Sequence, residues 1–160
     1  MTAEIVLRDA VPGDEALVAH FVRALAEFEK LLHKAHGTEA DSHRALFGTP
    51  PRAWALFAEL DGKPVGFALW FYNFSTFAAK PGLYVEDVFV APEHRGRGIG
   101  RMIFRHLARR ALDEGCACMQ WWVLNWNAPA IGFYRSIGAL PMDDWTVQRL
   151  DGDALAEFAD

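Results

Sequence analysis

The sequence predicts an α/β fold in which helices cover both faces of a mixed β-sheet. Two observations predict it. Short apolar runs rich in β-branched and aromatic residues alternate with longer segments whose apolar residues recur at helical spacing. Gly, Pro and Asp stand at most junctions between these segments, where they mark turns and helix ends. With 160 residues, of which 52% are hydrophobic and 23% charged, the chain is expected to form a single domain over residues 1–160.

The first part of the chain is expected to form one strand and two helices. Residues 5–7 are a short apolar run and predict a strand. Asp14 can cap the helix that follows, in which apolar residues recur at helical spacing as far as about Lys30. A short second helix is predicted over residues 41–47. The prolines at positions 50 and 51 mark its end.

The middle of the chain predicts a hairpin and a central strand. Residues 54–60 and 64–74 have the composition of strands and are joined at Asp61-Gly62, a dipeptide typical of a two-residue hairpin turn. Residues 75–82 are expected to form a loop. Residues 82–90 follow as a strand rich in β-branched and aromatic residues, which we place at the centre of the sheet.

The last part of the chain predicts three helices and two strands. In chain order they are a helix over 99–114 that Gly115 stops, a strand over 116–124, a helix from Asn127-Ala128-Pro129 to Ile137, a strand over 145–150 and a terminal helix over 152–159. Cys116 and Cys118 would share one face of their strand as small core residues. Their spacing does not match a redox CxxC pair, which favours a reducing compartment.

One segment points directly to a kind of ligand. The strand 82–90 is followed by a basic, glycine-rich stretch that leads straight into the helix predicted from residue 99. Unpaired N–H groups in the first turn of a helix attract anions, and glycines let a backbone approach a phosphate closely. This stretch, residues 95–101, is called the glycine-rich loop below; it contains Gly96, Gly98, Gly100, Arg95, Arg97 and Arg101. We interpret it as a pyrophosphate site, although it matches neither the P-loop nor the dinucleotide-binding pattern.

Charge and composition argue against several other classes of ligand. The formal net charge is −5, which is unfavourable for general binding to nucleic acid or to an anionic membrane. No apolar run reaches the roughly 18 residues that a membrane span needs, and no signal peptide is recognisable. No set of ligands around His33 and His36 completes a metal site. We therefore expect a cytoplasmic protein that needs no metal and binds neither nucleic acid nor membrane.

Four motifs in the second half of the chain form a specific set. They occupy residues 83–90, 92–100, 126–130 and 133–139. Together they closely resemble the GNAT superfamily of acetyl-CoA-dependent N-acetyltransferases. Residues 26–31 and 72–76 extend the similarity to the diamine (spermidine/spermine) acetyltransferase branch and to relatives that acetylate thialysine, a lysine-like amino acid. The resemblance implies a GNAT-like sheet with a splayed central strand, and direct acetyl transfer in a ternary complex.

The resemblance also implies roles for individual residues. The central strand would hold the pantetheine arm of acetyl-CoA through its backbone at Val88, Phe89 and Val90. The pyrophosphate would lie on the glycine-rich loop, at Arg95, Gly96, Arg97, Gly98, Ile99, Gly100 and Arg101. Asn127 and Tyr134 would also contact this cosubstrate, and Tyr134 would protonate the departing thiolate. Glu86 would help to remove a proton from the attacking amine, acting through water.

Elementary chemistry agrees with these two catalytic roles. An alkylammonium has a pKa of about 10.4 and no lone pair, so it must lose a proton before it can attack. A carboxylate inside an apolar strand is costly unless it is paired or used, which marks Glu86 independently of any family. The phenol of Tyr134 is neutral at pH 7 and can supply a proton to the leaving thiolate.

The acceptor is expected to be a primary amine of a small molecule, either a diamine or polyamine or a lysine-like amino acid. Glu29, Asp87 and Glu86 are the candidates to bind it, although many polyamine-type relatives have Tyr where Phe28 stands. Two alternatives to this function remain. One is an acetyltransferase acting on a protein lysine or N-terminus, against which the aromatic stretch 71–77 argues, because we expect it to close over a small acceptor. The other is a CoA-binding regulatory module without turnover. The resemblance also implies a homodimer.

Overall fold

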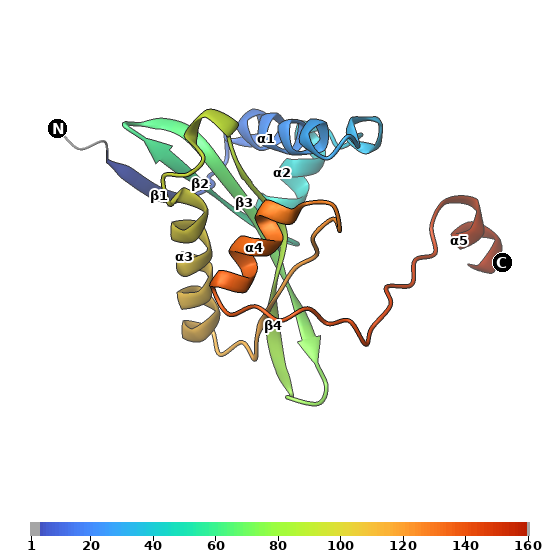
Figure 1. Cartoon of the computed structure of the whole chain (residues 1–160). Helices are drawn as coiled ribbons and strands as arrows, with labels where there is room; N and C mark the ends of the chain where they lie inside the picture. Colours follow the sequence, from blue (N-terminus) through green and yellow to red (C-terminus); the bar gives the residue numbers. More distant parts are fainter. Residues whose placement is uncertain (1–3, 160) are drawn as a thin grey trace. The chain divides into compact units, whose positions relative to one another are not determined.

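The structure is a computed structural model that describes residues 4–159. The chain divides into two compact units, Met1–Trp122 and Val123–Asp160. The first unit contains the β-sheet and helices α1 to α3, and the second contains helices α4 and α5 (Figure 1). Within residues 4–159, no helix combines the length and the apolar character that crossing a bilayer requires.

The sheet of the first unit is mixed, and its strands lie side by side in chain order. They are β1 (Ile5–Asp9), β2 (Trp54–Leu60), β3 (Lys63–Ser75), β4 (Lys80–Val90) and β5 (Met119–Gln120). Neighbours from β1 to β4 are antiparallel, and β4 and β5 are parallel. The predicted mixed sheet is confirmed, and β4 and β5 therefore run toward the same edge of it.

Two hairpins build most of this sheet. Asp61 and Gly62 join β2 to β3 with φ values of 49° and 76°, and positive φ at both positions is the twist-matched geometry that the sequence predicts. The second hairpin differs from the prediction. Residues 71–75 continue β3 and pair with the start of β4, where Phe71 is opposite Tyr84. The strand predicted over 64–74 is therefore confirmed, so most of the aromatic stretch 71–77 lies in the sheet and not in a loop. The loop predicted over 75–82 is shorter than expected, because the ladder continues to Ser75 and Lys80.

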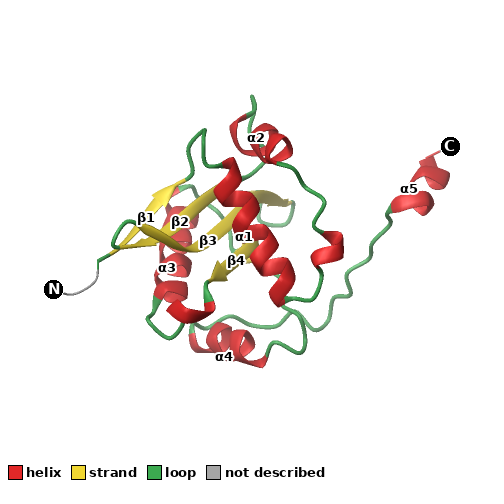
Figure 2. Ribbon diagram, turned by 90° about the horizontal axis from the view of Figure 1, so that it is seen from above, coloured by secondary structure: helices red, strands yellow, loops and turns green. Residues whose placement is uncertain are grey.

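Helices cover both faces of the sheet, as predicted (Figure 2). They are α1 (Glu15–Phe28), α2 (Glu39–Phe47) and α3 (Ile99–Asp113), with short 3-10 turns η1 (Leu32–Lys34) and η2 (Pro92–His94). On one face α1 and α2 pack on a cluster rich in Phe, namely Phe21, Phe57, Phe67 and Phe89. On the other face α3 packs on aliphatic residues and the fully buried Trp70. The apolar faces of the strands are thus buried on both sides.

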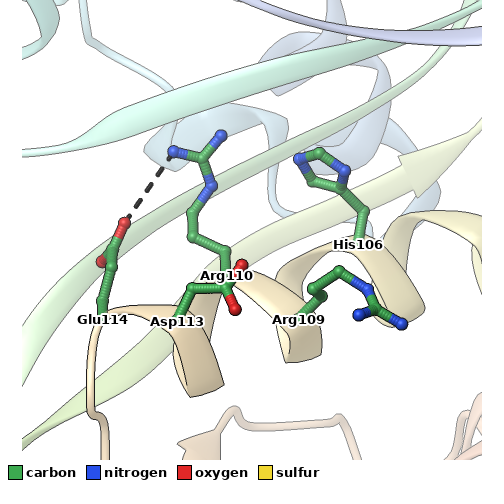
Figure 3. Close-up of a pocket in the computed structure, with 5 residues that line it drawn as sticks. All are labelled: His106, Arg109, Arg110, Asp113 and Glu114. Atoms are coloured by element: carbon green, nitrogen blue, oxygen red, sulfur yellow. Dashed lines mark ion pairs between the residues drawn. The ribbon is translucent and has the colours of Figure 1, made fainter.

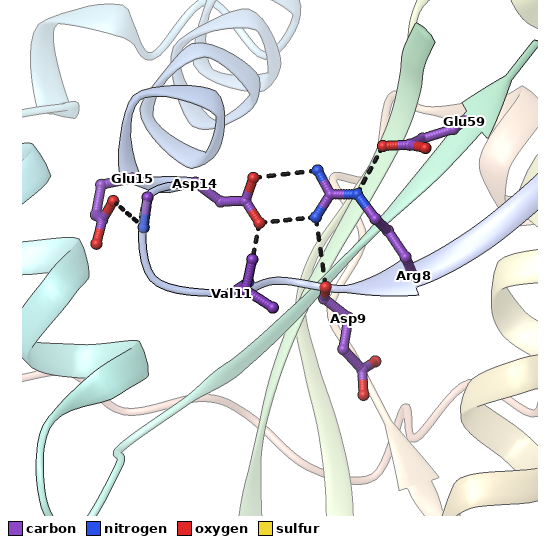
Figure 4. A network of polar contacts seen from close by, with 7 residues as sticks. Arg8, Asp9, Val11, Asp14, Glu15 and Glu59 are labelled. Carbon is purple, nitrogen blue, oxygen red and sulfur yellow. Dashed lines mark hydrogen bonds and ion pairs between the residues drawn. The ribbon is translucent and has the colours of Figure 1, made fainter. Parts of the chain in front are cut away.

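Arg8 ties three elements of the first unit together (Figure 4). From β1 its guanidinium donates to Asp14 at 2.7 Å, at the start of α1, and to Glu59 of β2 at 2.6 Å. The carboxylate of Asp14 also accepts the backbone N–H of Val11 and makes no capping bond to the helix. Asp14 occupies the N-cap position as predicted, but its side chain is committed to Arg8, which is the stronger, charge-assisted partner.

The second unit consists of α4 (Ala128–Ser136), α5 (Gly152–Ala159) and irregular segments. Both helices were predicted. The strand predicted over 145–150 is not formed, and β5 has only two of the residues expected in the strand 116–124. Residues 145–150 have strand composition but no neighbouring strand to take their backbone hydrogen bonds. Cys116 is partly buried and packs against the core, whereas Cys118 is exposed, so the expectation of a core position is wrong for Cys118.

Candidate functional site

The candidate site begins where β4 loses a neighbour. Strand β4 pairs with β5 only at Leu83 and Tyr84, whereas it pairs with β3 along its full length. Beyond Tyr84, residues 85–90 have no ladder partner on the β5 side within the described chain. This free edge agrees with the splayed strand that the resemblance implies, although β4 is the fourth of the five strands and not the central one as predicted. Val88, Phe89 and Val90 all lie on it.

A β-bulge lies at Glu86, at the start of this free edge. Leu69 of β3 is opposite Asp87, but the next residue, Trp70, is opposite Val85, so Glu86 has no partner in the register. One extra residue in a strand bends it locally and re-aims the side chains that follow. Bulges of this kind occur preferentially next to active sites.

The bulge decides which face each side chain of β4 occupies. Val85 packs in the cluster under α3, and Phe89 packs in the cluster under α1. Side chains alternate along a regular strand, so Val85 and Phe89 would share a face without the extra residue. Because Asp87 is two positions before Phe89, it lies on the α1 face. Glu86 remains exposed.

Two other carboxylates, Glu86 and Glu29, lie within electrostatic reach of Asp87. Asp87 is partly buried, and burial, followed by the charges of Glu86 and Glu29, raises its pKa to about 7. Glu29, the residue after α1, also has its pKa raised by burial. None of the ion pairs found within residues 4–159 involves these three groups. The site therefore concentrates negative charge that no basic side chain of the described residues neutralises.

Aromatic rings border these carboxylates. The Tyr84 ring lies 4.8 Å from that of Phe71 and 6.1 Å from that of Trp122, measured between centroids. Burial and the nearby charge of Glu86 raise the pKa of Tyr84 to about 12, so its phenol stays neutral. Aromatic faces beside carboxylates attract organic cations. Within the described residues, no three His, Cys, Asp or Glu side chains are arranged to hold a metal ion.

The glycine-rich loop follows β4 and η2 and opens into α3. Gly96 and Gly98 have φ values of 74° and 79°, a region that costs other residues about 1–2 kcal/mol. A methyl group added at Gly96, Gly98 or Gly100 would meet no atom within 4 Å. Space therefore remains beside the Cα atoms of these three glycines. Gly96 and Gly98 are therefore required by the backbone conformation rather than by crowding within the chain, whereas Gly100 has no positive φ.

The backbone of this loop presents a row of free donors. No acceptor within the described part of the chain takes the N–H groups of residues 96–100, and α3 has no side-chain cap. At the entry to the loop, the Nδ1 atom of His94 is buried and also has no partner among residues 4–159. Successive free N–H groups at the positive end of a helix form an anion site. The residues present therefore fit a pyrophosphate.

Arg95 contributes to this loop in a way the sequence did not predict. Its Nε donates to the carbonyl oxygen of Val90 at 2.8 Å, and its guanidinium lies 4.5 Å from the centre of the Phe28 ring and 5.4 Å from that of Phe89. The side chain thus packs between the end of α1 and the end of β4. Arg97 and Arg101 are exposed. Arg95 therefore braces the loop against Phe28, the last residue of α1.

Asn127 and Tyr134 belong to the second unit. The side-chain oxygen of Asn127 accepts the N–H of Ala130 at 3.3 Å and caps α4, and Pro129 lies in the first turn as predicted. Tyr134 is partly buried on α4, with its ring 5.6 Å from that of Phe133. The first unit brings together Glu29, the 86–90 segment and the glycine-rich loop. The roles of Asn127 and Tyr134 stay predictions.

A separate hollow of about 260 Å³ lies along the second half of α3 (Figure 3). Its lining residues are His106, Arg109, Arg110, Asp113 and Glu114. Arg110 is already occupied there, because it donates twice to Asp9 at 2.9 Å and lies over the Trp70 ring. The hollow is a structural junction between α3 and β1, distinct from the glycine-rich loop at the start of α3.

One feature of the site was missed from the sequence although a signal for it existed. Apolar residues alternate as Leu83 and Val85, and the alternation then resumes one position out of phase at Val88 and Val90. Such a break in period is the mark of an extra residue in a strand. From the sequence, Glu86 was expected to lie inside the apolar strand, but Glu86 is exposed and its neighbour Asp87 is the partly buried carboxylate. No comparable pattern in the sequence indicates the contact between Arg95 and Phe28.

Comparison with known proteins agrees with this geometry. The model of the acetyltransferase (GNAT) family matches residues 19–139. A thialysine N-epsilon-acetyltransferase of Bos taurus is 34% identical, covering 98% of this chain and 98% of its own length. A human spermidine/spermine N(1)-acetyltransferase-like protein is 32% identical over 96% of this chain, which corresponds to 23% of that protein.

The fold comparison leads to the same family. An integron cassette protein from the mobile metagenome of V. cholerae superposes with a TM-score of 0.81, covering 97% of both chains at 25% identity. The match of the family model spans most of the chain, and the bovine thialysine acetyltransferase matches it over nearly the full length of both proteins. This chain therefore belongs to the GNAT family and is an acetyltransferase.

Proposed function

We propose that this protein transfers the acetyl group of acetyl-CoA to a primary amine of a small molecule, by direct transfer in a ternary complex. The acceptor is a diamine or polyamine, or a lysine-like amino acid such as thialysine. One observation carries the proposal: a single strand, β4, leads from a carboxylate-rich face to a loop with free backbone donors. The first feature suits an ammonium group, and the second suits a pyrophosphate.

The donor side of the proposal uses the backbone. The N–H groups of residues 96–100 would bind the pyrophosphate of acetyl-CoA, helped by the charges of Arg97 and Arg101. The free edge of β4 at Val88, Phe89 and Val90 offers backbone groups to the pantetheine arm. The carbonyl of Val90 already accepts from Arg95, so the arm would rely on the remaining groups of that edge. Asn127 is proposed as a further contact.

The acceptor side uses charge. Glu29, Glu86 and Asp87 would attract a cationic acceptor, and their surplus of negative charge favours one with more than one ammonium group. The names of the bovine and human relatives describe acceptors of this kind, a lysine-like amino acid and a polyamine. Glu86 would assist loss of the amine's proton through water. Tyr134 would protonate the thiolate as the carbon–sulfur bond breaks.

Three further expectations belong to this proposal. Residues 1–160 would act as one catalytic domain, in keeping with a family match that runs from 19 to 139. The protein would work as a homodimer in the cytoplasm. No metal would be required, because neither proton transfer nor thioester aminolysis at this site needs a Lewis acid.

The deciding experiment measures CoA thiol release from acetyl-CoA with putrescine, spermidine, lysine, thialysine and a lysine-containing peptide. Turnover is expected on one or more of the small amines, and Tyr134→Phe should reduce it at least about tenfold. Tyr72→Phe is the matched control, because the Tyr72 hydroxyl accepts a hydrogen bond from the Trp70 indole on the α3 face, away from the candidate site. Preference for the peptide would favour a protein acceptor. Acetyl-CoA binding without turnover on any amine would favour a regulatory module.

A further inference from the structure

If the proposed function holds, one residue must accept the proton that the acceptor's ammonium group loses. We propose that Asp87, rather than its exposed neighbour Glu86, is the group that accepts the proton from the acceptor's ammonium. Glu86 then acts on Asp87 through its charge, instead of removing the amine's proton through water. The bulge at Glu86 is the structural device that makes this division of roles possible.

Geometry distinguishes the two adjacent carboxylates. The bulge leaves Glu86 unpaired and exposed, and turns Asp87 onto the face that carries Phe89 and is covered by α1. Asp87 is opposite Leu69, so β3 gives it an apolar neighbour with no competing hydrogen-bond partner. A base that must be held in one orientation and kept from bulk water is better placed at Asp87.

Asp87 also lies at the right point along the strand. The glycine-rich loop follows the C-terminal end of β4, and the free edge runs back from it through Val90 and Val88. An arm that extends from the loop along this edge meets Asp87 as the next residue. An amine placed to attack a thioester at the end of that arm would therefore have Asp87 beside it.

The affinity of Asp87 for a proton supports the assignment. Burial and two neighbouring negative charges raise its pKa from the ordinary 3.8 to about 7. A carboxylate with that pKa accepts a proton from an alkylammonium about a thousandfold more readily than an ordinary aspartate. It is also still ionised in a large fraction of molecules at neutral pH. A base is most effective when its pKa lies near the working pH.

The groups that face Asp87 determine how it should respond to mutation. Glu86 on β4 and Glu29 at the end of α1 are both negative, and both raise its pKa. Arg95 is on the same face but lies over Phe28 and Phe89. Removing either negative neighbour should lower the pKa of Asp87 and leave the base itself in place.

The proposed step balances. One N–H bond of the ammonium breaks, its electron pair stays on nitrogen, and the proton forms an O–H bond on Asp87. The nitrogen then bonds to the acetyl carbon and the carbon–sulfur bond breaks. The sulfur takes a proton from the general acid, which regains one from the nitrogen as the amide forms. Asp87 releases its proton to water, so one proton is produced per acetyl group transferred.

The test is the pH dependence of kcat at saturating acetyl-CoA and amine, for Asp87→Asn, Glu86→Gln and Glu29→Gln beside wild type. Wild-type kcat should fall as pH drops below about 7. Asp87→Asn should lose at least about a hundredfold at pH 8 and lack this fall. Glu86→Gln and Glu29→Gln should keep the fall but move it to lower pH, whatever their rates. Glu39→Gln at the start of α2 is the charge control and should not move it.

Two results would overturn the assignment while leaving the proposed function intact. One is an active Asp87→Asn variant that keeps the wild-type profile, and the other is a Glu86→Gln variant in which the fall disappears. A wild-type protein that acetylates no amine would instead overturn the proposed function first. Carbon NMR titration of the Asp87 carboxyl, assigned by its loss in Asp87→Asn, gives a readout without turnover. Titration near 4 rather than near 7 would also refute the assignment.

Discussion

Gly98 shows how a single residue can serve both the fold and the site. It is the N-cap of α3 and adopts φ 79°, a conformation that only glycine reaches without strain. This conformation turns the chain into the helix, and the N–H groups of residues 96–100 have no acceptor within the described residues. The glycine pattern was readable from sequence, whereas the division between strained and unstrained glycines was not.

Gly98→Ala and Gly100→Ala should therefore behave differently. Both add a methyl group with no atom within 4 Å, but only Gly98 has a positive φ. Gly98→Ala should lower the free energy of unfolding by about 1–2 kcal/mol and weaken CoA binding at least about tenfold, because the loop donors lose their alignment. Gly100→Ala should raise stability slightly, by about 0.5 kcal/mol. Urea unfolding and calorimetric titration with CoA check both; equal losses in the two variants would contradict the argument.

At the scale of elements, the most important contacts are those of Arg8, whose hydrogen bonds join β1, β2 and the start of α1. Sequence patterns placed all three elements but could not show that one guanidinium links them, since its partners are 6 and 51 positions away. The bond to Arg8 lowers the pKa of Asp14 below its usual value. Asp14 therefore stabilises the fold only in its ionised form.

Asp14→Asn should lower the free energy of unfolding by about 1–2 kcal/mol at pH 7, as expected for a partly buried, charge-assisted bond. The folded-state pKa is depressed, so this stabilisation is complete above about pH 4 and is lost as pH falls through the lower, folded-state value. The difference between wild type and variant should accordingly shrink between pH 7 and pH 3 in urea unfolding curves. Asp113→Asn, an exposed change on α3, is the control. A pH-independent difference would argue against the ion pair as the cause.

For the whole molecule, the notable feature is apolar surface in the second unit. Leu140, Met142, Trp145, Val147 and Leu150 are all exposed, as are Leu155 and Phe158 of α5. Monomeric proteins rarely expose so many large apolar side chains over one segment. The same segment has the alternation of a strand without a partner strand. Both facts support the proposed homodimer, in which a second chain would cover this segment.

Trp145→Glu should then convert a dimer to a monomer. Wild type should show twice the mass of one chain by light scattering at micromolar concentration, and the variant the mass of one chain. Leu112→Glu is the matched control, because Leu112 is also exposed, at 78%, but lies on α3. A wild-type protein with the mass of a single chain would show that the segment has another role.

The sequence by itself determined the features that depend on near neighbours in the chain. The Asp61-Gly62 turn, the helices α1, α3, α4 and α5 and the glycine-rich loop all follow from residues within a few positions of one another, and the set of motifs identified the family. The tertiary structure decided the rest. Whether Glu86 or Asp87 is buried depends on the register against β3, and the position of Arg95 depends on α1. Residues 145–150 stay irregular because a strand needs a partner, which local sequence cannot provide.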